Sequence, residues 1–160
     1  TVEMIPEFVG DEWSSTGILP EGTDNAEIRG NTVDVSDIGI GISTYNDEAK
    51  SNVIQGNSIL GSTCVEISAT QEDVKGTDIV DNTIKNSQEG LNIIEYGYLE
   101  GFEGGEITDT DVSDNDFMDN DVHVDDPDDF VDLNAILNEE GNTFDPDAEV
   151  DEDEIVPVPV

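Results

Sequence analysis

The sequence predicts an all-β fold, a right-handed parallel β-helix of about five coils with one short α-helix near its C-terminal end. Three features predict it: an asparagine-anchored repeat, apolar residues at period two within each repeat, and a preference for β-branched side chains. Ile and Val total 32, whereas Leu occurs only 6 times. We assign the β-helix to residues 25–150, an N-terminal cap or linker to 1–24, and a tail to 151–160.

The repeats come into register on one asparagine per coil. The anchors are Asn31, Asn57, Asn82, Asn115 and Asn142, at spacings of 26, 25, 33 and 27 residues. Three residues before the anchor stand Ile28, Ile54, Ile79 and Val112, and two residues after it stand Val33, Ile59, Ile84, Phe117 and Phe144. An apolar pair follows, namely Ile40 and Ile42, Val65 and Ile67, Leu91 and Ile93, and Val122 and Val124. Because one coil cannot bury its own apolar face, we expect each coil to be covered by the next.

The anchor asparagines are expected to form a structural ladder at one corner of the coil. Asn tolerates left-handed backbone angles, so it suits a bend between two strands. Stacked amides can also hydrogen-bond from coil to coil. A leucine-rich repeat has a similar period, but it needs leucine five residues before the asparagine, where this chain has Ala26, Asn52, Thr77 and Thr110.

Two segments depart from the repeat. The insertion at 95–108 carries Tyr96, Tyr98 and Phe102, and it is expected either to stack on a carbohydrate or to cover the side of the β-helix. Residues 127–140 have helical apolar spacing, beginning at Pro127 and ending before Gly141, so we expect a helix there. The tail is acidic and then rich in Pro and Val, and we expect it to pack on a neighbouring chain or domain.

The charge balance excludes several partners. There are 41 acidic residues against 4 basic ones, which indicates adaptation to high salt, where the Debye length falls to about 3 Å. Nucleic acid and anionic membranes need basic patches and are therefore not expected as partners. The single cysteine, Cys64, excludes an intrachain disulfide, and no apolar stretch is long enough to insert into a membrane.

The repeated asparagine and apolar positions resemble the right-handed parallel β-helix superfamily over about residues 25–150. That superfamily includes pectate lyases, other polysaccharide-modifying enzymes, phage tailspikes and surface proteins of halophilic archaea. The resemblance implies a fold and a haloarchaeal type of protein, but it does not imply an activity.

No catalytic residue, metal ligand or cofactor is expected from the sequence. The only arginine, Arg29, lies beside no evident acid cluster, and the segments typical of polygalacturonases are absent. His123 alternates with Val122 and Val124, so we expect it to point outward as a lone exposed histidine. The Asp-rich run 109–121 fails as an EF-hand loop, because it has no central glycine and has Asn120 in place of the final glutamate. Weak, non-specific cation binding is the remaining expectation.

Two functions remain open. The first is a non-catalytic structural or adhesion module of a halophile surface, filament or virion, extracellular and working as a homo-oligomer or within a larger assembly. The second is a carbohydrate-active enzyme, a glycoside hydrolase or lyase, with acidic residues in a groove and a glycan as its partner. Two carboxylates converging beside the aromatic insertion would favour the second.

Overall fold

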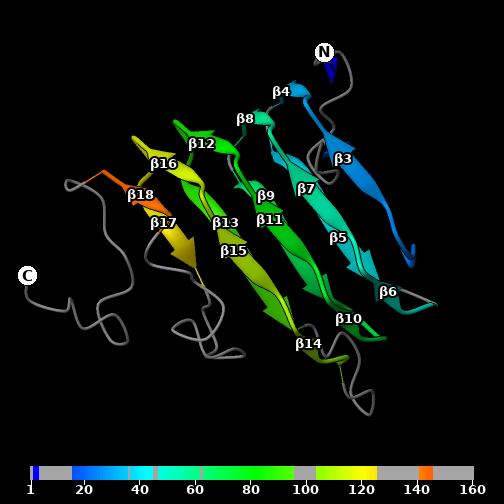
Figure 1. Ribbon diagram of the computed structural model, residues 1–160. Helices are drawn as coiled ribbons and strands as arrows, with labels where there is room; N and C mark the ends of the chain where they lie inside the picture. Colours follow the sequence, from blue (N-terminus) through cyan, green and yellow to red (C-terminus); the bar gives the residue numbers. More distant parts are fainter. Residues whose placement is uncertain are drawn as a thin grey trace, which may run out of the picture.

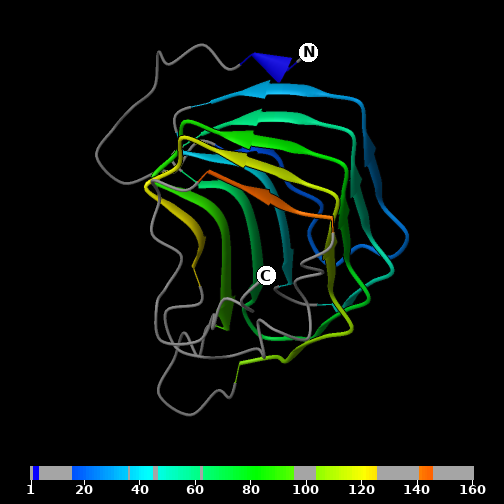
Figure 2. The same ribbon diagram turned by 60° about the vertical axis from the view of Figure 1, so that its left-hand side comes forward.

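The computed structural model describes residues 2–3, 16–35, 37–44, 47–61, 63–95, 104–125 and 141–145. These residues form an all-β parallel solenoid of about four turns (Figure 1). Figure 2 shows successive turns of the chain lying over one another. The described part contains no helix.

Four parallel sheets run along the stack, and the turns that begin at Glu27, Val53 and Asp78 each add one strand to every sheet. The six-stranded sheet contains β1 (Val2–Glu3), β4 (Thr32–Asp34), β8 (Ser58–Leu60), β12 (Thr83–Lys85), β16 (Asp116–Met118) and β18 (Thr143–Phe144). The four-stranded sheet contains β3 (Glu27–Arg29), β7 (Val53–Gln55), β11 (Asp78–Val80) and β15 (Asp111–Ser113).

The other two sheets complete each turn. The five-stranded sheet contains β2 (Thr16–Ile18), β5 (Ile38–Thr44), β9 (Thr63–Ala69), β13 (Glu89–Glu95) and β17 (Val122–Asp125). The three-stranded sheet contains β6 (Ala49–Lys50), β10 (Val74–Lys75) and β14 (Ile107–Thr108). The strands of the five-stranded sheet are the longest, so this sheet offers the broadest outer face.

The predicted interior columns are confirmed. Ile28, Ile54, Ile79 and Val112 pair in register in the four-stranded sheet. Val33, Ile59, Ile84, Phe117 and Phe144 do the same in the six-stranded sheet. Their side chains join one core with the apolar residues of the five-stranded sheet. Each coil therefore buries its apolar face against its neighbours, as the period requires.

The predicted bend at the anchor asparagines lies one residue earlier than expected. Positive φ angles occur at Gly30, Gly56, Asp81 and Asp114, which directly precede the ladder asparagines. The asparagines are not among the described residues with positive φ, because their side chains turn inward to bond the neighbouring coil. The residue before each one is free of that task and carries the left-handed bend.

The prediction that His123 points outward is wrong. Gly39, Cys64, Gly90 and His123 hold the same place in successive strands, just before Ile40, Val65, Leu91 and Val124. At this place the strand bends, so two consecutive residues are buried, and strict alternation fails. His123 is fully buried, and its ring lies against Phe117 and Phe144, at centroid distances of 6.0 and 5.5 Å. Val122 is correspondingly only half-buried.

Several predictions lie outside the described residues. These are the helix at 127–140, the tail at 151–160, the aromatic residues of the insertion and most of the N-terminal cap. Of the predicted fifth coil, the structure describes residues 141–145, which supply the ladder residue Asn142 and strand β18.

Candidate functional site

The outer face of the five-stranded sheet carries a polar patch. One row across the sheet contains Gly41, Glu66, Asn92 and Asp125, which are paired in register. A second row contains Ile38, Thr63, Glu89 and Val122. Both rows face outward because the two residues between them, such as Cys64 and Val65, are both buried. The strand bend that buries His123 thus also brings the polar residues of both rows onto one face.

Glu89 on β13 accepts two side-chain hydrogen bonds. Thr63 donates a hydrogen bond of 2.9 Å from Oγ1 to Glu89 Oε2. Asn92 donates a second, of 2.8 Å, from Nδ2 to the same oxygen. Two donors on one carboxylate oxygen fix the orientation of the side chain.

Glu66 lies in the neighbouring strand β9. Burial raises the pKa of its carboxyl above the ordinary value of 4.5, and the nearby negative charge of Glu89 raises it further. A hydrogen bond from Ser68 acts in the other direction and is the smaller effect relative to burial. The pKa of the Glu66 carboxyl is therefore raised chiefly because burial disfavours its charged form.

Asn92 completes the patch. It is 9% exposed, and its Oδ1 has no hydrogen-bond partner in the described part of the structure. Its amide orientation is set by the bond from Nδ2 to Glu89, since only the NH₂ group can donate to a carboxylate. Oδ1 is therefore a buried acceptor that lacks a donor.

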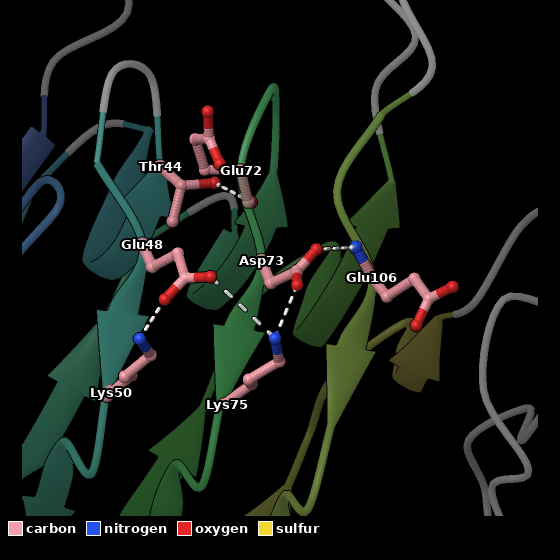
Figure 3. A network of polar contacts seen from close by, with 7 residues as sticks. All are labelled: Thr44, Glu48, Lys50, Glu72, Asp73, Lys75 and Glu106. Carbon is pink, nitrogen blue, oxygen red and sulfur yellow. Dashed lines mark hydrogen bonds and ion pairs between the residues drawn. The ribbon is translucent and has the colours of Figure 1, made fainter.

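A second polar cluster lies at the corner between the five-stranded and three-stranded sheets (Figure 3). Lys50 and Lys75 pair in register there, and Glu48 forms ion pairs with both. Asp73 lies 2.5 Å from Lys75 Nζ and accepts a 2.9 Å hydrogen bond from the Glu106 amide. That amide, and then Lys75, hold the pKa of Asp73 below its ordinary value of 3.8. These groups satisfy one another, so we read the cluster as a surface brace between turns.

The predicted site residues have different outcomes. The five anchor asparagines form one continuous ladder, in which Nδ2 of each of the first four donates to Oδ1 of the next at 2.9–3.1 Å. Tyr96, Tyr98 and Phe102 lie outside the described residues. Sequence reasoning missed Glu66, Glu89 and Asn92, and the only signal for them was their position beside the apolar pairs.

These features define the class of protein: a parallel β-solenoid with an asparagine-laddered interior and a polar outer face on its longest sheet. A family model described as "Periplasmic copper-binding protein (NosD)" matches residues 10–143, well over half of the chain. The chain belongs to this family. No curated protein and no solved structure matched the chain.

The family description corrects the expectation that no cofactor is involved, because it points to copper. Within the described ranges, however, no three His, Cys, Asp or Glu side chains form a group that could hold a metal ion. Cys64 is buried, and burial raises the pKa of its thiol, whereas copper needs an accessible thiolate or imidazole. His123 already contacts Asn120 through Nδ1 and the Asp145 carbonyl through Nε2. These two soft donors therefore do not fit a copper site.

The expected location is extracellular, on a cell surface or on a virion, and the periplasmic description of the family is consistent with an extracellular or cell-envelope location. Among the residues that the structure describes, no helix is long and apolar enough to cross a membrane.

Proposed function

We propose that this chain is a non-catalytic structural or adhesion module of a halophile surface, filament or virion, working as a homo-oligomer or within a larger assembly. The observation that carries the proposal is the use of the repeat. The recurring apolar positions form the interior columns and the recurring asparagines form the ladder, whereas several outward positions change from turn to turn. In the six-stranded sheet, for example, the outward residues at the ends of β4, β8, β12 and β16 are Asp34, Leu60, Lys85 and Met118. A regular support with a variable surface suits recognition.

The test is binding of the purified chain to isolated halophile cell envelopes, at about 3 M KCl so that charge is screened. We expect saturable binding, with no release of reducing sugars or unsaturated uronates from the envelope polysaccharide. Release of either product, at a rate that scales with protein concentration, would contradict the proposal.

A second candidate function is the carbohydrate-active enzyme, and the pair Glu66 and Glu89 favours it. A carboxyl with a raised pKa, close enough to a second carboxyl to interact with it electrostatically, is what a general acid and its partner require. If this candidate is right, Glu66→Gln and Glu89→Gln should each abolish the product release described above. Asp78→Asn, an exposed carboxylate on β11, is the matched control that should leave it unchanged.

A further inference from the structure

We infer that His123 makes the last coil sensitive to acid: its neutral ring holds the last described strand, β18, on the stack, and protonation of the ring releases that strand. The proposed adhesion function does not require this release, so either can fail without the other.

Asn120 determines which nitrogen of the His123 ring is unprotonated. Its Oδ1 accepts hydrogen bonds from the amide and the hydroxyl of Ser87, at 3.2 and 2.7 Å, and its Nδ2 donates to the Ile84 carbonyl at 3.1 Å. These three bonds fix which end of the Asn120 side chain is the NH₂ group. That group lies 3.3 Å from His123 Nδ1, so Nδ1 must be the unprotonated nitrogen that accepts a hydrogen bond.

The other ring nitrogen contacts the last strand. His123 Nε2 lies 3.1 Å from the carbonyl oxygen of Asp145, and because a carbonyl can only accept, Nε2 carries the proton and donates it. Asp145 directly follows β18, which is the last strand of the six-stranded sheet (Figure 1). The ring of Phe144, on β18, packs against the His123 ring with a centroid distance of 5.5 Å. The neutral ring therefore joins β17 to β18 through one hydrogen bond and one ring contact.

A positively charged ring does not fit this place. A second proton would lie on Nδ1 and point at the NH₂ group of Asn120, so that two donors would face each other where one hydrogen bond is now made. The His123 side chain is fully buried, so the charged form would also lose its hydration. The neighbouring rings of Phe117 and Phe144 offer no acceptor for a second N–H group.

The carboxyl groups on the surrounding elements form no ion pair with the ring in the described structure. Three of them are exposed, two lie in the outward rows of the five-stranded sheet, and the last belongs to a residue that contacts the ring through its backbone carbonyl. In this order they are Asp116, Asp119, Asp121, Glu89, Asp125 and Asp145. The thiol of Cys64 lies two strands away, with Gly90 between. Attraction between these acids and a charged ring acts over a distance, and concentrated salt weakens it.

Acid should therefore open the last coil. An imidazole free of these contacts titrates near about pH 6.5. The released state then binds a proton that the closed state does not, so the closed state loses stability as the pH falls below that value. The released fraction should be about tenfold larger at about pH 5.5 than at about pH 8. This direction is opposite to the one expected for Glu66, whose carboxyl has a raised pKa.

Hydrogen exchange of backbone amides tests this release, with the whole chain in about 2 M KCl so that surface charge is screened. The amides of Thr143 and Asp145 donate to the carbonyls of Asn115 and Phe117 at 2.8 and 3.1 Å, so their exchange reports the opening of β18. The Thr83 amide, which donates to a carbonyl at 2.8 Å within the same sheet, is the internal control. Each rate is divided by that of an unstructured peptide at the same pH, which removes the intrinsic effect of pH on exchange. The variant His123→Gln keeps a donor for the Asp145 carbonyl and cannot become charged.

We expect the protection of the Thr143 and Asp145 amides to fall about tenfold between about pH 8 and about pH 5.5, while the Thr83 amide keeps its protection. The fall should be absent in His123→Gln. Equal protection at the two pH values in the wild type, an equal fall in the variant, or a parallel fall at Thr83 would each overturn the inference.

A second measurement needs no substitution and decides the question if the variant does not fold. Nitrogen-15 spectra of the ring report which nitrogen carries a proton, and the signals need no assignment because His123 is the only histidine of the chain. We expect a protonated Nε2 and an unprotonated Nδ1 at about pH 8. A proton on Nδ1 at that pH would overturn the inference, whereas the envelope-binding experiment judges the proposed function separately.

Discussion

At the scale of single residues, two neighbouring residues have different roles at the corners of the coil. One residue adopts a left-handed angle, and the next turns a polar side chain inward. This holds for Asp81 before Asn82 and for Asp114 before Asn115. It also holds for Ser51 before Asn52 and for Asp119 before Asn120, at two further corners. A short polar residue tolerates the left-handed angle, and its neighbour satisfies backbone groups that the bend leaves unpaired.

The ladder gives the first prediction. Oδ1 of Asn82 accepts bonds from both the amide and Nδ2 of Asn57, at 3.0 Å each, and all of these groups are buried. Asn82→Ala would leave them without a partner, so we expect the free energy of unfolding to fall by about 3 kcal/mol, since each buried unpaired group costs roughly 1–3 kcal/mol. Denaturant unfolding measures the change. Asn31→Ala, at the half-exposed end of the ladder, is the control and should cost about 1 kcal/mol. Equal losses at the two positions would contradict a buried ladder.

Glu66 gives a prediction on pH. Its pKa is raised in the folded chain, mainly by burial, so the folded state holds the proton more tightly than the unfolded state. The free energy of unfolding should therefore fall as the pH rises from 4.5 through the raised pKa. Glu66→Gln removes this loss, so the variant should be more stable than the wild type at pH 8, and the difference should vanish below pH 4.5. Thermal melts over this range test it, with Asp78→Asn as the exposed control. A difference that does not depend on pH would show that Glu66 is not desolvated.

At the scale of elements, a second polar column runs beside the core next to the complete ladder, and this one is incomplete. The column that starts at Ala26 continues through Asn52, Thr77 and Thr110, all of which are buried. Asn52 Oδ1 accepts the Ala26 amide, but Asn52 Nδ2 and the hydroxyls of Thr77 and Thr110 have no partner in the described structure. This column therefore contains one side-chain hydrogen bond between turns, from the Ala26 amide to Asn52, and none at its later positions in the described structure.

Completing this column should stabilise the chain. Thr77→Asn places an amide oxygen above Asn52, in the position that Asn82 Oδ1 holds above Asn57. We expect the free energy of unfolding to rise by about 1 kcal/mol, the usual gain from one added hydrogen bond. Urea unfolding at constant salt measures it. Thr77→Val keeps the shape without an added bond and should gain less, so a larger gain from valine would contradict the expected pairing.

How far the elements could be predicted depended on what each residue contacts. The columns at Ile28 and Val33 were predictable because burial on every turn imposes one residue type at one repeat position. His123 was not, because the bend at the start of the five-stranded sheet buries two consecutive residues, and period two cannot show a bend. Gly90 was a sign of close packing at this place: a Cβ there would lie 2.5 Å from the His123 carbonyl oxygen and 3.0 Å from Phe117. Glu66 and Glu89 could not be chosen among 41 acidic residues, because their roles depend on neighbours 23 to 26 residues away.

At the scale of the whole molecule, a continuous core is surrounded by a surface of one charge. The net charge is −37, and two of the four basic residues are used in the brace between turns, where Glu48 and Asp73 bind them (Figure 3). Exposed ion pairs of this kind contribute little stability on their own. The remaining repulsion opposes folding and is weakened only by screening.

Salt should therefore decide stability. We expect the melting temperature to rise by tens of degrees between about 0.1 M and about 3 M KCl, because the Debye length falls from about 10 Å to below about 3 Å over that range. Circular dichroism at a strand wavelength measures it. Equal melting temperatures at the two concentrations would show that the acidic surface has another cause than adaptation to salt.

The stacking of parallel turns is the central claim, and couplings across hydrogen bonds test it most directly. In the structure the amides of Asp78, Thr83 and Asp116 donate to the carbonyls of Asn52, Asn57 and Asn82, each one turn away, at 2.9, 2.8 and 2.8 Å. A long-range nitrogen–carbonyl correlation experiment on the labelled chain in high salt should show these three couplings between residues 26, 26 and 34 positions apart. Couplings that instead join these amides to nearby residues across a hairpin would contradict the parallel solenoid.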